Sequence, residues 1–175
     1  MKERAMAQKE IPMSRSYAVQ ENIVLPGDTN MHNTMFGGLL MKHIDETAAI
    51  SARRHSKCPV VTASNDGVHF HRPIQNDDIV RLESFVCSAG RTSMEVFIKI
   101  STEHSETGNV ELAAISYLTF VALGKNGRPT EVPLPVPQSE EEMLVHRDRQ
   151  PRKEMRQKKR AETNTLIKSL TLRQT

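Results

Sequence analysis

The sequence predicts an α+β fold, in which a five-stranded antiparallel sheet wraps around one long helix. Apolar residues recur at helical spacing over residues 37–55, and four segments of strand character follow with only short links between them. The predicted helix is apolar on most sides, so a strongly curved sheet is needed to cover it. One such sheet still leaves unpaired edges, and we therefore expect two copies to join edge to edge.

The chain has 175 residues, enough for one domain and a tail. No apolar run is close to the length of a membrane span, about eighteen residues. The first ten residues lack the apolar core of a signal peptide. Cys58 and Cys87 match neither a disulfide framework nor a Cys-x-x-Cys metal site, which favours reduced thiols. We expect a cytoplasmic protein with no membrane partner and no bound metal.

The net charge of +3 is unevenly distributed. From residue 138 onward there are ten Lys or Arg against six Asp or Glu, so the excess lies in the tail and the preceding body is close to neutral. A neutral body argues against nucleic acid as the partner.

The predicted elements follow in order along the chain. Residues 1–15 are charged and rich in methionine, and we expect a flexible lead-in. A first strand is predicted over residues 16–25, before Pro26 and Gly27, and Pro59 prevents the central helix from continuing.

Four strands separated by turn residues complete the predicted sheet. Gly67, inside the first of the four, marks a possible bulge. In the third, apolar residues alternate and share one face: Met94, Val96, Ile98 and Ile100. The four predicted strands span residues 60–70, 79–88, 92–101 and 111–123.

The folded domain is predicted over residues 16–137, because four prolines between Pro129 and Pro137 interrupt regular structure. Residues 138–175 form a charged C-terminal tail. It is Glu-rich first and basic later, an order that suits a surface helix to about residue 160. Because the tail is polar and follows a proline-rich link, we expect it to be dispensable for folding.

The central helix contains a carboxylate among apolar neighbours. Asp45 lies one turn from Met41 and from Ala49, and a carboxylate in such a setting is costly unless it has a partner. Such groups are often retained for chemistry. A structural aspartate that caps a loop or pairs with a neighbour is the alternative. Glu46 is expected only to pair with Lys42, one turn back.

Three motifs resemble the hotdog-fold acyl-CoA thioesterases, in the subgroup of the brain-type cytosolic acyl-CoA hydrolase and its bacterial relatives. They are NMHNTMFGGLLMKHIDETAAISARRH at residues 30–55, VVTASNDGVHFHRPI at residues 60–74 and GRTSM at residues 90–94. The resemblance implies a hotdog fold, double-hotdog dimers that often form trimers of dimers, and hydrolysis of acyl-CoA to free acid and CoA. CoA would enter as part of the substrate, with no separate cofactor.

The resemblance also implies site residues. The catalytic aspartate of the family falls on Asp45. Its second active-site residue is an asparagine three places before the Gly-Gly pair. That place is Thr34 here, with Asn33 just before it, so either residue can take the role. Asn30 matches an asparagine usual in this loop. The CoA contacts of the family fall on Ala63, Ser64, Asn65, Thr92, Ser93 and Met94.

Thioester hydrolysis needs an activated water or nucleophile, a group that stabilises the oxyanion, and a binding site for the thiol half of the substrate, which is CoA. Asp45 can act as a general base or as a nucleophile that forms a mixed anhydride. A backbone N–H at the helix start can stabilise the oxyanion, because Gly37 and Gly38 allow the substrate to approach closely. A tight entrance to the helix is the alternative explanation for the two glycines. Arg91, the strand hydroxyls and the basic tail offer donors to CoA phosphates.

Two other functions on the same fold remain open. A dehydratase would use a histidine with an acidic partner, and no histidine occupies the helix position of Asp45. An acyl-CoA-sensing regulator would need a helix-turn-helix, for which the residues before Ser16 are too few. The spacing of the histidines matches no metal-ligand motif, so we expect core or surface histidines rather than a metal site. They are His32, His43, His55, His69 and His71.

Overall fold

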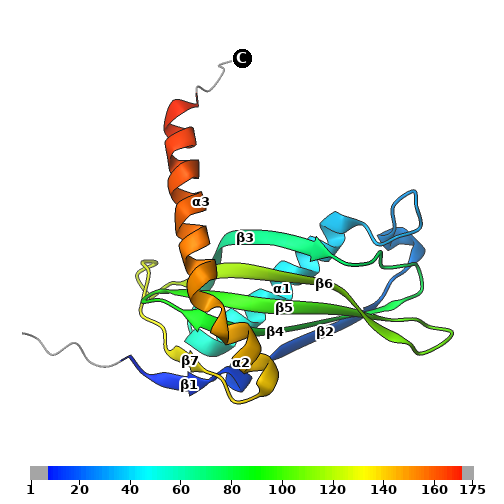
Figure 1. Cartoon of the computed structure of the whole chain (residues 1–175), viewed down its shortest axis with the longest axis horizontal. Coiled ribbons are helices and arrows are strands. Elements are labelled where there is room, and N and C mark those ends of the chain that lie inside the picture. Colours follow the sequence, from blue (N-terminus) through cyan, green and yellow to red (C-terminus); the bar gives the residue numbers. More distant parts are fainter. Residues whose placement is uncertain (1–7, 171–175) are drawn as a thin grey trace, which may run out of the picture.

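The computed structural model describes residues 8–170 and has the predicted architecture (Figure 1). An antiparallel sheet has the strand order β2-β4-β5-β6-β3, and the helix α1 (Gly37–Ser56) packs along one face of it. The predicted fold is therefore confirmed, and the bounds of the central helix and the five strands differ from the predicted ones by at most two residues, whereas the helix predicted to about residue 160 is two helices that reach Ser169. The strands are β2 (Ala18–Ile23), β3 (Val60–Phe70), β4 (Ile79–Ala89), β5 (Ser93–Glu103) and β6 (Val110–Ala122).

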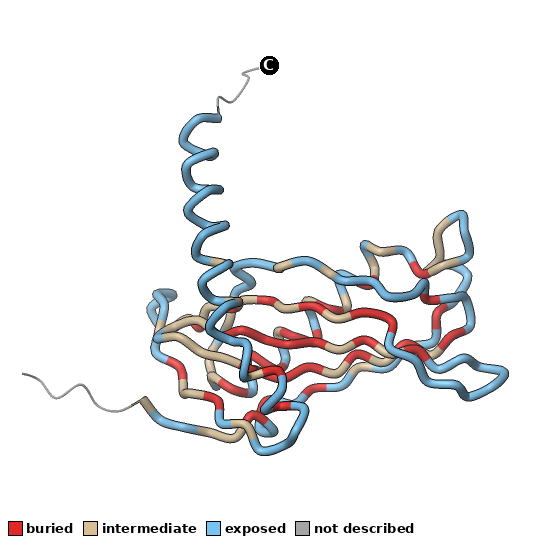
Figure 2. Tube along the Cα trace, in the orientation of Figure 1, coloured by how far each residue is buried: buried red, intermediate tan, exposed pale blue. Residues whose placement is uncertain are grey.

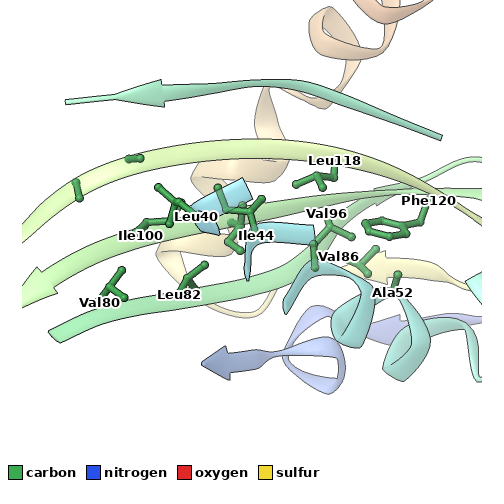
Figure 3. Packing of buried hydrophobic residues seen from close by; sticks show 14 of the residues in the cluster. Leu40, Ile44, Ala52, Val80, Leu82, Val86, Val96, Ile100, Leu118 and Phe120 are labelled. Atoms are coloured by element: carbon green, nitrogen blue, oxygen red, sulfur yellow. The ribbon is translucent and has the colours of Figure 1, made fainter. Parts of the chain in front are cut away.

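One face of α1 forms the core together with the facing side of the sheet (Figure 3). Leu40, Ile44, Ala48 and Ala52 follow one another along a single helix stripe, and each is at most 1% exposed. The alternation predicted for β5 is confirmed, because the four predicted residues all belong to this core: Met94, Val96, Ile98 and Ile100. α1 then ends at Lys57, which has a left-handed φ of 56° and donates its N–H to the Arg53 carbonyl at 2.9 Å.

The opposite side of α1 is open, which differs from the prediction of a helix buried on most sides. Ile50, on this side, is 42% exposed, and Met41, on another side near the start of the helix, is 51% exposed. The physical reason is that the sheet of one chain does not close around the helix: β2 and β3 are its two edges and do not pair with each other. The apolar side chains of Met41 and Ile50 are left in contact with solvent. As predicted, Lys42 and Glu46 pair on this wetter side at 3.3 Å.

β3 is bulged where the sequence indicated. Its register against β6 shifts between Asn65 and Val68, around Gly67, which has a φ of 111° that only glycine adopts readily. A second shift lies between Thr62 and Ser64. Most side chains of β3 are exposed, the apolar Val61 and Phe70 among them, so this edge strand contributes little to the core.

The N-terminal segment is structured from residue 10, which differs from the flexible lead-in predicted through residue 15. β1 (Glu10–Pro12) pairs in parallel with β7 (Leu134–Val136), and a 3₁₀ helix (Met13–Ser16) follows. The reason is that the Met13 side chain is fully buried against the outer face of the sheet. Residues 1–7 of the predicted lead-in lie outside the described part of the chain.

The tail forms two helices, α2 (Glu140–Arg147) and α3 (Arg149–Ser169), on the face of the sheet opposite α1 (Figure 1). Val145 of α2 is 7% exposed and belongs to an outer apolar cluster with residues of β4 and β5: Phe85, Cys87 and Phe97. Figure 2 shows that most of α3, by contrast, is exposed and extends away from the domain. The packing of α2 therefore argues against a tail that is dispensable for folding.

None of the helices within residues 8–170 has both the length and the apolar character that crossing a membrane requires.

The contribution of α2 to folding can be measured at two neighbouring residues. Val145→Ala removes two buried carbon groups, so the free energy of unfolding should fall by about 1–2 kcal/mol. Leu144→Ala serves as the control, because Leu144 is 57% exposed and should change stability by less than about 0.5 kcal/mol. Urea denaturation measures both, and equal losses would contradict a docked α2.

Candidate active site

Asp45 lies on α1 where the helix passes β3. The hydroxyl of Thr62, on β3, donates a hydrogen bond to Asp45 Oδ1 at 2.7 Å. Asp45 is partly exposed, and within residues 8–170 it has no ion-pair partner within 4 Å and no further hydrogen bond to its side chain. One carboxylate oxygen is thus held in place and the other is free. A carboxylate that only stabilised the fold would be expected to have more partners than this.

The start of α1 has free backbone donors. No side chain caps the helix, and Leu39 and Leu40 donate their N–H groups to the Phe36 carbonyl. The N–H groups of Gly37 and Gly38 are left without a partner in the described chain. A Cβ on Gly37 would meet no atom within 4 Å, so packing within one chain does not require glycine there. This helix end is open to a negatively charged group.

Asn30 organises the loop before α1. Its Nδ2 donates to Thr34 Oγ1 at 2.9 Å, its Oδ1 accepts from the His32 N–H at 2.8 Å, and its carbonyl accepts from the Asn33 N–H at 3.0 Å. Asn33 is exposed with a left-handed φ of 57°, and Thr34 is partly buried. Of the candidates in the loop, Asn30 makes the most contacts.

A small cavity of about 230 Å³ lies at this end of α1. Asn30 and Thr34 form its polar part, and Gly37 lies at its margin. The apolar part comes from Leu40 and Phe70, with others around them. The cavity is therefore lined by an amide, a hydroxyl, an apolar wall and Gly37, one of the two glycines with a free N–H.

The structure does not bring the helix start and Asp45 into one site within a single chain. Gly38 and Asp45 share a helix face but lie seven residues apart, which is about 10 Å at 1.5 Å per residue. One thioester carbonyl cannot contact both. The predicted loop residues Asn33 and Thr34 lie at the same far end as Gly38.

The residues predicted to contact CoA are brought together on the other side of β3. A cavity of about 540 Å³ lies between α3 and the strands β3, β4, β5 and β6. Two predicted residues are just outside it: Arg91 is exposed, and the Thr92 carbonyl accepts from the Ala122 N–H at 3.0 Å. The other five form part of its wall: Ala63, Ser64, Asn65, Ser93 and Met94.

Two features of the site were not predicted from the sequence. Thr62 was missed because a lone threonine in a strand carries no signal of its own, and only the fold places it opposite Asp45. The basic tail was predicted to offer donors to CoA phosphates, but nothing local in the sequence indicates which of its residues line the cavity beside β3.

No three His, Cys, Asp or Glu side chains of residues 8–170 gather closely enough to hold a metal ion. His55 is the most buried histidine: it is 1% exposed, and its Nε2 donates to the Pro133 carbonyl at 2.9 Å. Its Nδ1 has no partner in the described chain. Burial lowers the pKa of His55, although the hydrogen bond to Pro133 opposes this shift.

Comparison with known proteins identifies the family. Residues 32–109 match the model of the thioesterase superfamily. An uncharacterized acyl-CoA thioester hydrolase of Bacillus subtilis is 48% identical over 155 residues, 89% of this chain and 90% of that protein. The chain belongs to the acyl-CoA thioester hydrolases of this superfamily. The family suggested by the three motifs is thus confirmed.

Solved structures of the family superpose closely on this chain. One is an acyl-CoA hydrolase from Staphylococcus aureus in complex with butyryl-CoA, CoA and CoA disulfide, at 42% identity and a TM-score of 0.89, covering 91% of this chain and 98% of that one. Further structures of that hydrolase carry alanine in place of an aspartate, an asparagine or a threonine. A hexameric acyl-CoA thioesterase is 42% identical with a TM-score of 0.84, covering 87% and 98% of the two chains.

The buried His55 makes stability depend on pH. Its folded pKa is lowered from about 6.5, so between these two values the unfolded chain binds more protons than the folded one. The free energy of unfolding should therefore fall as the pH is lowered from 7 to 5. Urea denaturation of His55→Gln should show a weaker fall than wild type, whereas His32→Gln, at an exposed position, should retain it. Equal slopes in all three proteins would contradict this role of His55.

Proposed function

We propose that this protein hydrolyses acyl-CoA thioesters to free acid and CoA. The observation that carries the proposal is the partly exposed Asp45 carboxylate, oriented by Thr62 and without a charged partner among the described residues. The sequence and structural likeness to acyl-CoA hydrolases, one of them in complex with butyryl-CoA and CoA, supports the same activity here. CoA is a part of the substrate, and we propose no separate cofactor.

In this proposal Asp45 activates the attack on the thioester carbonyl. As a general base it removes a proton from water while the water oxygen bonds to the carbonyl carbon, and the proton then passes to the leaving CoA thiolate. As a nucleophile it forms an acyl anhydride that water hydrolyses in a second step. Both routes place negative charge on the carbonyl oxygen. Hydrogen bonds from the free N–H groups of Gly37 and Gly38 would stabilise this charge.

We propose Asn30 as the asparagine of the site, in preference to Asn33 or Thr34. The asparagine replaced in the S. aureus hydrolase precedes the replaced aspartate by fifteen positions, and the replaced threonine follows that aspartate by seventeen. Asn30, Asp45 and Thr62 have the same spacing in this chain. This agreement, together with the hydrogen bonds of Asn30 and Thr62, supports these three as a set.

We propose that the complete site contains residues from two chains. The helix start and Asp45 of one chain are too far apart to contact one thioester, whereas a helix start from a second copy can approach Asp45. The unpaired edge of β3 and the exposed Met41, one helical turn before Asp45, offer a surface on which a second copy would pair. The hexameric relative makes a trimer of such double-hotdog dimers the assembly to test.

A dehydratase or an acyl-CoA-sensing protein on the same fold would release no thiol from acyl-CoA. A thiol-release assay over a panel of acyl chain lengths therefore separates the three functions and also determines the preferred substrate. A cytoplasmic location stays a prediction.

The role of Asp45 can be tested with Asp45→Asn, which keeps the size of the side chain and its bond to Thr62 but removes its charge and basicity. Loss of a catalytic base should lower kcat by about 10²–10⁴-fold. Glu46→Gln is the matched control, because Glu46 is the exposed neighbouring carboxylate and should keep kcat within about twofold. A folded Asp45→Asn protein with more than about a tenth of wild-type kcat would exclude this mechanism.

A two-chain site predicts complementation. Chains with Asp45→Asn and chains with Asn30→Ala should each be nearly inactive alone. After subunit exchange, mixed dimers contain one site with both groups intact, so activity should return to as much as about a quarter of wild type if chains mix at random. Absence of any recovery, with exchange verified by mass spectrometry of differently tagged chains, would place both groups in one chain.

A further inference from the structure

Two carboxylates of the sheet fix the first turns of α3 and set its direction. Arg152 donates to both oxygens of Glu95 in β5 at 3.0 Å, and Glu95 is only 3% exposed. Arg156, one turn later, pairs with Glu95 as well and with Asp66 of β3 at 3.5 Å. Bidentate pairing with a buried carboxylate holds a definite geometry. α3 therefore crosses the strands and passes beyond the unpaired edge of β3 (Figure 1).

The end of α3 beyond that edge carries exposed apolar side chains. Leu166, Ile167 and Leu170 are each more than half exposed, and their spacing places them on one side of the helix. This group, the α3 tip, follows a basic stretch, and residues 158–170 hold four Lys or Arg and one Glu. A short helix end has little stability of its own in water, so a surface to pack on would stabilise the tip.

A second exposed apolar group lies on the outer face of the sheet, the face opposite α1. Leu112 and Val110 of β6 are directly opposite Ser101 and Glu103 of β5, which follow the core residue Ile100 in alternation and so point outward. Leu112 and Val110 form the β6 row, and both are exposed because α2 and α3 do not reach them. The adjoining segment 103–111 holds three Glu and no Lys or Arg. The β6 row is thus apolar and bordered by negative charge.

The α3 tip and the β6 row of one chain lie far apart (Figure 1). A second copy paired along β3 would continue the sheet in the order β6, β3, partner β3, partner β6. Arg156 pairs with strands on both sides of β6, so it lies over β6, and the partner's β6 is three strand spacings farther, about 14 Å. α3 spans this distance in about ten residues, at 1.5 Å per residue. The α3 tip would therefore lie over the partner's β6.

The two-fold symmetry of such a dimer also selects the correct end of that strand. Residues 63–66, in the first half of β3, line the cavity beneath α3. A two-fold axis reverses the partner's strands, so α3 would pass over the second half of the partner's β3. In each chain that half pairs with the first half of β6, as His69 pairs with Ile115. The β6 row belongs to this first half.

We propose that the α3 tip of each chain packs on the β6 row of the partner subunit in a dimer paired along β3. Contact between the two apolar groups removes both from solvent, and the cations of α3 then lie near the acidic segment 103–111 of the second copy. The inference rests on the chain pairing in the proposed function and goes beyond it. α3 becomes an arm that holds two chains together and takes no part in the chemistry.

Disulfide cross-linking tests this contact directly. Chains with Ile167→Cys and differently tagged chains with Leu112→Cys are mixed, allowed to exchange and oxidised, and chains with only the native cysteines measure the background. A disulfide needs Cα atoms within about 7 Å of each other, so the two tags should become linked. Val19→Cys replaces Leu112→Cys in the control, because Val19 is an exposed apolar residue on the far edge strand β2. The control should give at least about tenfold less linked product.

The stability of the dimer provides an independent measurement. Leu166→Gln/Ile167→Gln removes apolar side chains from the α3 tip without lowering helix propensity. The dissociation constant of the dimer should rise at least about tenfold, because these side chains are then no longer buried on pairing. Met143→Gln/Met155→Gln removes two exposed side chains outside the tip and should change it less than about twofold. Sedimentation velocity over a dilution series measures both constants.

Other occupants of the α3 tip give different results. If two tips contacted each other, chains that all carry Ile167→Cys would link as readily as the mixed pair, which would overturn the proposal. Wild type that sediments with phosphatidylglycerol vesicles, while the tip variant does not, would also overturn it, because the tip would then insert into a bilayer. Absence of the link between Ile167→Cys and Leu112→Cys would do the same. Complementation between Asp45→Asn and Asn30→Ala does not involve α3, so recovery of activity without this link would reject the α3 contact alone.

Discussion

The close packing of one stripe of α1 against the sheet determines where the polar residues of this protein lie. Ala48 and Ala52 are fully buried and small, so the helix axis can approach the strands at this end, while Leu40 and Ile44 fill the space at the other (Figure 3). With this stripe buried, the rotation of the helix is set. Asp45, the residue after Ile44, then faces β3 and meets the Thr62 hydroxyl.

The same sheet depends on its outer face for a second set of contacts. Glu95 follows the core residue Met94 in β5 and therefore points away from α1, where it is buried under α3. A buried carboxylate is tolerated only with charged partners, and both partners come from the tail. Burial, with the nearby Glu95 charge, raises the pKa of the Cys87 thiol well above its usual value, so this cysteine stays protonated and unreactive. Two of the basic residues of the tail thus neutralise a buried carboxylate of the sheet.

The geometry of one chain is the basis for the proposed link between assembly and activity. Its helix start offers free N–H groups, its helix middle offers a carboxylate, and about 10 Å separates them. The exposed Met41, one helical turn before Asp45, and the unpaired edge of β3 lie beside that carboxylate. In the proposed assembly, the pairing of two chains both covers exposed apolar side chains and completes the active site, so selection for a stable dimer would also preserve the site.

The sequence by itself determined the order and type of the elements. The spacing of Leu40, Ile44 and Ala48 is helical, and Met94, Val96 and their neighbours alternate, because these periods follow from local backbone geometry. It also indicated Asp45, since a carboxylate inside an apolar helix stands out. Only the tertiary structure decided that Thr62 is its partner, that Asn30 organises the loop and that α3 covers a cationic cavity. These contacts join residues far apart in the chain, and their geometry depends on helix rotation, strand register and bulges, none of which a local pattern specifies.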